Sequence, residues 1–346
     1  MLFGLSGLED LILGLGEKSF RARQLAEWLY LRGATSFSDM GNLPHSLREI
    51  LDARYVFSQP RVQQKLVASD GTTRYLLELA DGEQVETVAI PSGKRLTVCF
   101  STQVGCALGC VFCATGRLGL KRSLMPGEMA AQLALVVADF DNTRVSNVVA
   151  MGQGEPFANY DATLSALRMM NSPRLFGVGA RHITVSTAGL INQISRFADE
   201  PEQFTLAVSL HSAEQRIRDS LMPGLRAQPL AELREALLCY MAKTSRRPSL
   251  EYALIQGVND DPGSLASLLA FCDAPAPGFH INLIPLNINA DEESSAEPLV
   301  KADATAVRLF EQRLCEAGIS VSRRVSKGES IAAACGQLAS KQNSVL

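Results

Sequence analysis

The chain has 346 residues, 47% hydrophobic and 20% charged, and its 33 basic and 36 acidic side chains leave a formal net charge of −3. This composition is that of a soluble globular protein and excludes global disorder, a collagen-like repeat and a coiled coil. The balanced charge excludes a protein that binds nucleic acid over its whole surface. No apolar run reaches the roughly 20 residues of a membrane helix, and the N-terminus lacks the basic region of a signal peptide. We therefore expect a cytoplasmic protein that does not enter a membrane.

The first part of the chain has the pattern of a small helical module. Ser19 is expected to cap a helix that stops at Gly33, and Ser46 to cap a second helix that ends near Ala53. After Pro60 the apolar residues alternate with a period of two, which predicts strands over 62–68, 73–79, 85–90 and 96–100. These patterns predict a helical accessory domain over 1–58 and a β-hairpin extension over 59–100.

From Pro126 onward, strand-like apolar runs alternate with helical stretches. Strands are predicted over 147–151, 183–187, 206–210, 250–255, 281–284 and 319–321, and helices over 126–140, 161–170, 191–198, 230–242, 262–271 and 303–317. Six βα-like units in series imply a parallel sheet and fit an incomplete (β/α)6 barrel, which we assign to 101–346. The fold class is α/β, and in such sheets the carboxyl ends of the strands carry the site.

Four of the eight cysteines fall within fifteen residues. Cys106, Cys110 and Cys113 have the spacing C-x3-C-x2-C, so three thiolates on one loop could hold an iron–sulfur cube and leave its fourth iron open to a substrate or cofactor. A structural zinc site would want four ligands, and no histidine stands near this loop. We predict an iron–sulfur cluster, with zinc and three unrelated buried cysteines as the alternatives. The remaining Cys239, Cys272 and Cys315 match no motif and are interpreted as structural; Cys99 and Cys335 are considered below.

Several polar residues follow the predicted strands at the ends where a ligand would bind. Gly154 and Glu155 come after the first strand, where glycine lets the backbone approach a ligand and the carboxylate can accept from an amino group. By itself such a loop is usually an ordinary βα turn. Later strand ends carry further candidates for nucleoside contacts: Ser186, Ser209, Leu210, His211 and Asn287. His211 could equally be a core histidine.

The cysteine loop followed by six βα-like units resembles the radical S-adenosylmethionine (SAM) enzymes. Narrower motifs resemble the RlmN/Cfr family, radical SAM methylases of an adenine in 23S rRNA; they lie at 103–110, 154–156, 159–160, 221–223, 257–260 and 334–338, and 20–25 with 28–30 resemble the family's N-terminal accessory domain. The resemblance spans about 18–340. It implies a radical SAM partial barrel, a [4Fe–4S] cluster on Cys106, Cys110 and Cys113, two SAM molecules per turnover, and the residues at the strand ends as SAM ligands. It also implies an RNA substrate (rRNA, with tRNA as an extension), an external one-electron reductant such as flavodoxin or ferredoxin, and a monomer.

The resemblance also assigns three catalytic roles. Cys335 takes a methyl group from one SAM; after a radical forms on that methyl group and adds to the base, Cys99 attacks Cys335 and releases the product with formation of a disulfide. Glu86 matches the base that removes the proton from the adduct carbon. From the residues alone, both cysteines would be core fillers and Glu86 a solvated side chain on a strand.

Although the net charge of the whole chain is small, one short segment is basic. No Asp or Glu occurs between Thr87 and Gly127, and Arg117, Lys121 and Arg122 directly follow the cysteine loop. These three cations are predicted to contact RNA phosphates; a solvated basic loop is the alternative.

The sequence departs from the family pattern at Gln153, at 288–298 and at 328–332. These departures leave the mechanism intact but leave the substrate open. Methylation at C2 of adenine is the leading reading, with C8 methylation as the alternative. A radical SAM enzyme acting on a non-RNA substrate and a zinc-binding RNA module are the remaining alternatives.

Overall fold

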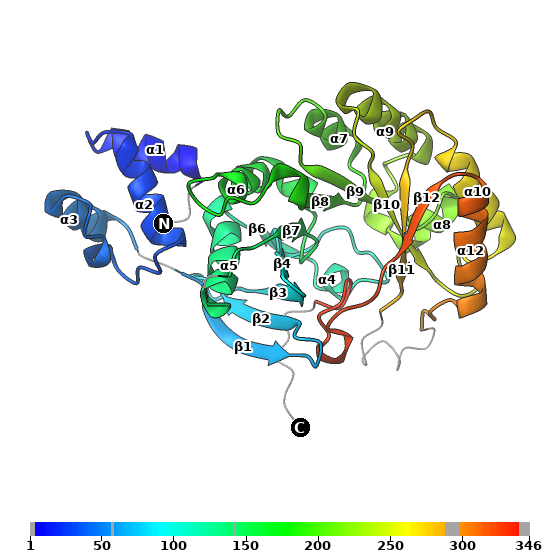
Figure 1. The fold of residues 1–346 in the computed structure, drawn as a ribbon, viewed down its shortest axis with the longest axis horizontal. Helices are drawn as coiled ribbons and strands as arrows, with labels where there is room; N and C mark the ends of the chain where they lie inside the picture. Colours follow the sequence, from blue (N-terminus) through cyan, green and yellow to red (C-terminus); the bar gives the residue numbers. More distant parts are fainter. Residues whose placement is uncertain (1–3, 57–58, 142, 288–297, 339–346) are drawn as a thin grey trace.

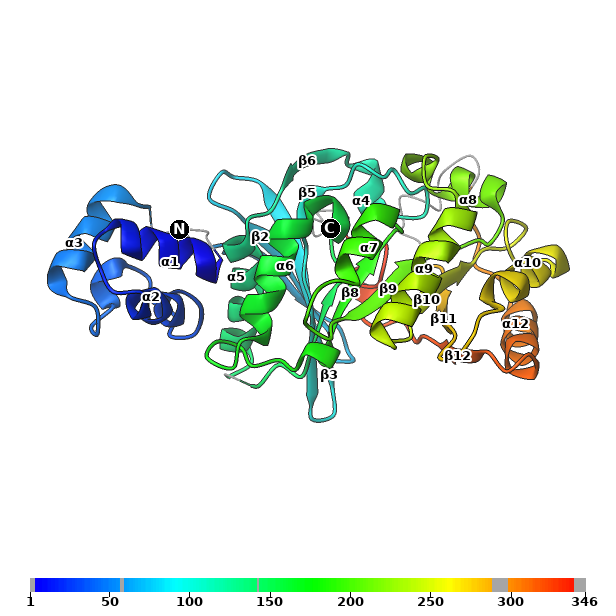
Figure 2. The ribbon, with the colours of Figure 1, turned by 90° about the horizontal axis from the view of Figure 1, so that it is seen from above.

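The structure is a computed structural model that describes residues 4–56, 59–141, 143–287 and 298–338. Helices cover the outer side of one large curved sheet, and a group of N-terminal helices extends from one end of it (Figures 1 and 2). Within the described residues, no helix is long and apolar enough to cross a membrane. Of the family departures, 288–297 lie outside the described residues.

The N-terminal helices form a module with a hydrophobic core of its own. It comprises α1 (Leu5–Gly14), α2 (Phe20–Tyr30), a short 3-10 turn (Phe37–Asp39) and α3 (His45–Arg54). Ala130 and Met169, from two helices of the main body, belong to the same core. The expected caps were wrong in detail: Ser19 makes no capping hydrogen bond, and α3 begins one residue before Ser46, directly after Pro44.

Four strands then form an antiparallel meander: β1 (Arg61–Val67), β2 (Thr73–Glu78), β3 (Gln84–Ser92) and β4 (Arg95–Cys99). Gly71 and Gly82 supply the positive φ angles that the two tight turns require, +83° and +84°. On its other edge β4 pairs in parallel with β7. The meander is therefore continuous with the parallel sheet. The sheet crosses the predicted boundary at residue 100, because β4 pairs with β3 on one side and with β7 on the other.

The predicted six βα units are present in order. The parallel strands that follow β4 are β7 (Asn147–Ala150), β8 (Ile183–Thr187), β9 (Thr205–Ser209), β10 (Ser249–Leu254), β11 (His280–Pro285) and β12 (Ser320–Arg323). They extend one open sheet in the order β1-β2-β3-β4-β7-β8-β9-β10-β11-β12. This confirms the α/β fold with an incomplete barrel, because the two terminal strands of the sheet do not pair with each other.

The helices between the strands are α5 (Pro126–Asp139), α6 (Tyr160–Asn171), α7 (Ile191–Phe197), α8 (Gln215–Leu221), α9 (Leu230–Thr244), α10 (Pro262–Cys272) and α12 (Ala304–Glu316). Local chemistry fixes where two of them start. Asp261 and Asp303 each accept hydrogen bonds from two backbone N–H groups of the first turn of α10 and α12, which satisfies donors that a helix start leaves free.

The chain after β12 returns across the carboxyl ends of the strands. Arg74 on β2 donates to the carbonyl of Ala332 at 3.1 Å, Ala114 N–H donates to Gly336 at 2.7 Å, and Thr115 donates to Leu338 at 2.7 Å. We call residues 326–338 the C-terminal segment; it includes the unusual 328–332 stretch. Because α4 (Ala114–Arg117) directly follows the cysteine loop, these bonds hold the segment beside that loop.

Candidate active site

A cavity of about 970 Å³, part of it open to solvent, lies at the carboxyl ends of the parallel strands. We call it the main cavity. Its wall brings together ten of the thirteen residues predicted from the sequence: Cys106, Cys110, Cys113, Gly154, Glu155, Ser186, Ser209, His211, Asn287 and Cys335. These residues come from segments far apart in the chain, so only the fold collects them.

The cysteine loop forms one wall of the main cavity. It lies between β5 (Gln103–Gly105) and α4 and is tied down at both ends, since Cys106 N–H donates to Gly119 at 3.1 Å and Val111 N–H to Leu221 at 3.0 Å. Gly116 is required here, because a Cβ atom would lie 2.8 Å from the backbone of Cys110. The loop is thus a fixed scaffold for its thiols.

Burial raises the pKa of the Cys106 thiol to about 11, and burial is also the main cause of the raised pKa of the Cys110 thiol. Both are therefore neutral thiols until a metal displaces the proton. In the described part of the chain, no three His, Cys, Asp or Glu side chains are grouped so that they could hold a single metal ion. Three thiols along one cavity wall, none of them in a disulfide, supply the donor set for an iron–sulfur cluster with one open iron.

The loop after β7 places a carboxylate at the cavity. Gly154 has φ +97°, and a Cβ atom there would lie 2.5 Å from the side chain of Gln103, so only glycine fits. The Glu155 carboxylate accepts from Phe157 N–H at 2.9 Å and from Ala188 N–H at 2.7 Å. Burial raises its pKa to about 6, so above that pH a held anion faces the cavity.

The loop after β9 holds a neutral histidine. His211 Nδ1 accepts from Ala253 N–H at 3.1 Å, and its ring lies edge-on to Phe112 of the cysteine loop, with centroids 4.6 Å apart. Burial lowers the pKa of His211 to about 3. The neighbouring Leu210 does not line the cavity; its side chain is buried in the main core.

The two cysteines outside the loop meet at a second cavity of about 780 Å³. Cys99, at the end of β4, and Cys335, in the C-terminal segment, both line it, and Cys335 lines the main cavity as well. Asn287 donates to the Cys335 carbonyl at 3.2 Å, which fixes that residue between the two cavities. The implied disulfide is not formed, because all eight cysteines are free.

Burial, and then the nearby Cys335, raise the pKa of the Cys99 thiol to about 12. At pH 8 about one Cys99 in 10⁴ is therefore a thiolate, and the thiolate is the reactive form. We expect iodoacetamide at pH 8 to alkylate the exposed Cys239 and Cys315 while leaving Cys99 unmodified until the protein is unfolded. Peptide mass spectrometry over time measures this, with the two exposed thiols as internal controls. Alkylation of Cys99 at the rate of Cys315 would contradict the expectation.

Glu86 lies outside both cavities. It is buried on β3, and Arg74 forms an ion pair with its carboxylate at 3.4 Å. The same arginine holds the Ala332 carbonyl, so Glu86 is connected to the C-terminal segment through Arg74 rather than in contact with the cavity wall.

Sequence reasoning missed two charged residues of the site. Arg324 lines both cavities directly after β12 and pairs with the buried Glu251 of β10, which lines the main cavity, at 3.8 Å. The nearby Cys335 raises the pKa of Arg324 against the effect of burial, and Glu251 and Cys99 act in the same direction as Cys335. Both residues stand on predicted strands or at their ends, which is the signal that could have found them.

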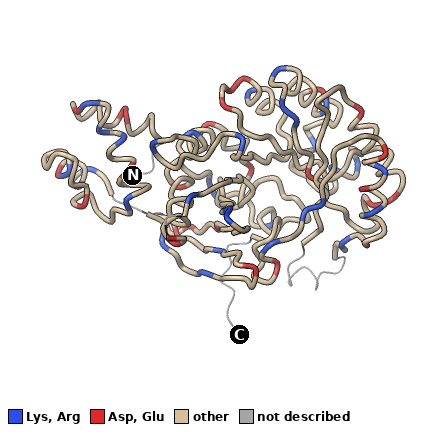
Figure 3. Tube along the Cα trace, viewed as in Figure 1, with Lys and Arg blue, Asp and Glu red and all other residues tan. Residues whose placement is uncertain are grey.

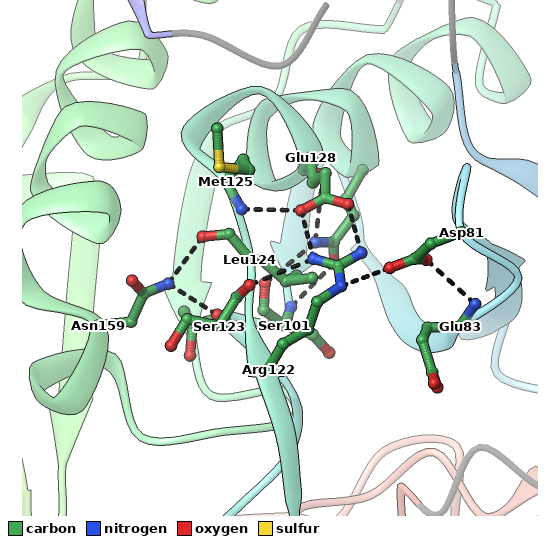
Figure 4. A network of polar contacts seen from close by, with 11 residues as sticks. Asp81, Glu83, Ser101, Arg122, Ser123, Leu124, Met125, Glu128 and Asn159 are labelled. Atoms are coloured by element: carbon green, nitrogen blue, oxygen red, sulfur yellow. Dashed lines mark hydrogen bonds and ion pairs between the residues drawn. The ribbon is translucent and has the colours of Figure 1, made fainter.

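Two cations of the basic segment, Lys121 and Arg122, form ion pairs within the protein. Arg122 binds Asp81 at 2.6 Å and the buried Glu128 at 2.7 Å, joining the meander to α5 (Figure 4). Lys121 pairs with Glu83 at 2.7 Å. Across the molecule, Lys and Arg alternate with Asp and Glu (Figure 3). Lys121 and Arg122 thus have carboxylate partners within the protein, and the RNA phosphate contacts of Arg117, Lys121 and Arg122 stay a prediction.

Comparison with known proteins agrees with this site. Residues 100–266 match the family model of the radical SAM superfamily, and residues 2–56 match that of the ribosomal RNA large subunit methyltransferase N-terminal domain. A crystal structure of a radical SAM methyltransferase from Sphaerobacter thermophilus superposes with a TM-score of 0.89, at 40% identity over 98% of both chains. The fold and cysteine loop thus define a radical SAM enzyme.

The family is narrower still. "Probable dual-specificity RNA methyltransferase RlmN" of Geobacillus kaustophilus is 43% identical over 98% of this chain and 91% of its own. The protein of the same name from Bacillus subtilis is 42% identical over 98% of this chain and 92% of its own. The chain belongs to the RlmN family. Its cofactors are accordingly a [4Fe–4S] cluster and SAM, two molecules of SAM per turnover.

Proposed function

We propose that this protein methylates C2 of an adenine in RNA, in 23S rRNA and in tRNA, through a methyl group carried on Cys335. The relatives at 42–43% identity are named dual-specificity RNA methyltransferases. The observation that carries the proposal is the pair of free thiols, Cys99 and Cys335, at one cavity beside the cysteine loop. A radical SAM enzyme without a methyl carrier has no need of that pair.

In this proposal Cys106, Cys110 and Cys113 hold the cluster. Glu155, held by two backbone donors, receives the amino group of SAM; Gly154, Ser186, Ser209, Leu210, His211 and Asn287 complete the SAM site. Leu210 contributes through its backbone, because its side chain faces the core. The bound cluster and SAM supply a carbon-centred radical that abstracts a hydrogen atom.

Cys335 acts as a nucleophile and then as a carrier. As a thiolate its sulfur attacks the methyl group of a first SAM, forming a thioether and releasing the demethylated donor. Asn287 and the bond from Ala114 to Gly336 hold this cysteine at the opening between the two cavities. Cys99, as a thiolate, later attacks the Cys335 sulfur. A sulfur–sulfur bond forms, the bond from the Cys335 sulfur to the methylene carbon breaks, and that carbon keeps the electron pair and takes a proton, which frees the methylated RNA and leaves a transient disulfide.

Glu86 is proposed as the base that takes the proton from the adduct carbon. Its ion pair with Arg74, and the bond from Arg74 to Ala332, mean that the C-terminal segment must shift before Glu86 reaches the adduct. The N-terminal module is proposed to contact RNA because it matches the family's N-terminal domain. A flavodoxin- or ferredoxin-like reductant, a monomeric state and a cytoplasmic location complete the proposal.

RNA from cells with and without the gene tests the substrate. We expect 2-methyladenosine in 23S rRNA and tRNA, detected by mass spectrometry of nuclease digests, to disappear on deletion and to return with the wild-type gene but not with a Cys335→Ala gene. Loss of 8-methyladenosine instead would assign C8 methylation. An unchanged set of methylated adenosines would reject an RNA substrate.

A further inference from the structure

A buried arginine lies behind the cysteine loop without a matching acceptor for most of its donors. Arg218, on α8, is completely buried. Its Nη2 donates to the carbonyl of Ala188, but its Nε and Nη1 atoms have no hydrogen-bond partner among the described residues. A guanidinium carries five N–H donors and stays protonated in proteins. A buried charge of this kind is normally paired.

The surroundings of Arg218 do not supply that pairing. Burial lowers its pKa to about 10, so it remains a cation at neutral pH; Cys110 and then Asp219 act in the opposite direction. The Asp219 carboxylate accepts from Gln215 at 2.7 Å, and no carboxylate of the described residues forms an ion pair with Arg218. His211, which also lies near, is neutral, because burial and then Arg218 itself lower its pKa.

Arg218 is also fixed in place. A Cβ atom on Gly189 would lie 3.1 Å from its Nη2 atom, so the backbone after β8 packs directly against the guanidinium. Ala188 connects it to the site, because its carbonyl accepts from Arg218 while its N–H donates to Glu155. Ala188 belongs to the apolar cluster against which Cys110 packs, and Val111 N–H of the cysteine loop donates to Leu221, one turn further along α8. Arg218 therefore lies beside the cysteine loop, outside the lining of the main cavity.

We propose that Arg218 is a positioning residue for the cluster: it supplies a buried positive charge and unmatched hydrogen-bond donors beside the cysteine loop that make the bound cluster easier to reduce. The inference rests on the proposed cluster ligands. A cluster on three thiolates is an anionic group, and reduction adds one more negative charge, so a cation at short range in a buried site favours the reduced form. Hydrogen bonds and charge beside cluster sulfurs set reduction potentials in this way.

The test compares Arg218→Met, which removes the charge, with Arg218→Lys, which keeps it without the planar fork. Arg246→Met is the matched control, since Arg246 is a half-buried arginine that donates to backbone carbonyls at the opposite ends of the strands. Each protein is reconstituted anaerobically with iron and sulfide, and the reduction potential of its cluster is measured in a redox titration followed by electron paramagnetic resonance. We expect Arg218→Met to lower the equilibrium constant for cluster reduction at least tenfold. This corresponds to a reduction potential that is more negative by 59 mV or more for a one-electron couple. Arg218→Lys should lie between it and wild type, and Arg246→Met at wild type.

Two further measurements separate this role from a purely structural one. The Arg218→Met cluster should lose iron to a chelator faster than wild type. The cluster-free Arg218→Met protein should melt at the same temperature as cluster-free wild type or higher, because the variant no longer buries unmatched donors. If the reduction potential and the iron retention of Arg218→Met are unchanged, the inference is overturned while the proposed function stands. A lower melting temperature with an unchanged potential has the same consequence. A wild-type chain that takes up no [4Fe–4S] cluster would overturn the proposed function together with it.

Discussion

In the Cys99→Ala variant, substrate RNA is expected to remain covalently attached to Cys335. The variant keeps the cluster ligands and the methyl carrier, so methyl loading and addition to the base proceed. It lacks the thiol that breaks the bond between Cys335 and the RNA. Cys99 is the only other cysteine that lines the second cavity with Cys335, and the three thiols that share the main cavity with Cys335 are the proposed cluster ligands, so no thiol is left to replace Cys99. Product formation should fall to background, with at most one RNA bound per protein.

A denaturing gel followed by nuclease digestion and peptide mass spectrometry measures the adduct. A nucleotide should be found on the peptide that contains Cys335 in Cys99→Ala, and no adduct should form in the Cys99→Ala/Cys335→Ala double variant. Cys315→Ala is the control, because Cys315 is an exposed thiol on α12 and lines neither cavity. Normal turnover by Cys99→Ala or Cys335→Ala would reject the two-cysteine mechanism.

Replacing any one of Cys106, Cys110 and Cys113 by alanine is expected to remove most of the iron and all radical cleavage of SAM. All three thiols line one wall of the main cavity, and with two thiolates left the cluster has too few protein ligands on that wall. The measurement is iron per protein and the visible absorption after anaerobic reconstitution, before and after dithionite. Cys272→Ala is a control for the loss of a buried cysteine elsewhere, since Cys272 is buried in α10.

Full iron retention in Cys110→Ala would reject the ligand assignment. Loss of iron from Cys272→Ala as well would indicate general destabilisation of the fold. Thermal unfolding of the cluster-free variants distinguishes the two results, because ligand loss leaves that melting temperature close to wild type.

The sequence alone predicted the order and type of the main elements. The six strands after residue 140 lie within about two residues of their predicted places, because each combines an apolar run with a preceding helical stretch. Helix starts were less reliable. Nothing local distinguishes Ser46 from its neighbours, and Pro44 in an extended conformation sets the start of α3 instead.

The sequence by itself also determined the family and predicted the cluster-ligand set, because the three cysteines and the motifs around them are contiguous and chemically specific. Only the tertiary structure decided which distant residues share the site. Arg324 and Glu251 stand on separate elements without a spacing that links them, and the parallel order of the strands brings them to one cavity. It likewise decided that Lys121 and Arg122 are paired with carboxylates: Arg122 meets Asp81 and Glu128 only because the meander packs against α5. Charge in a sequence is local, whereas compensation of that charge depends on contacts between segments far apart in the chain.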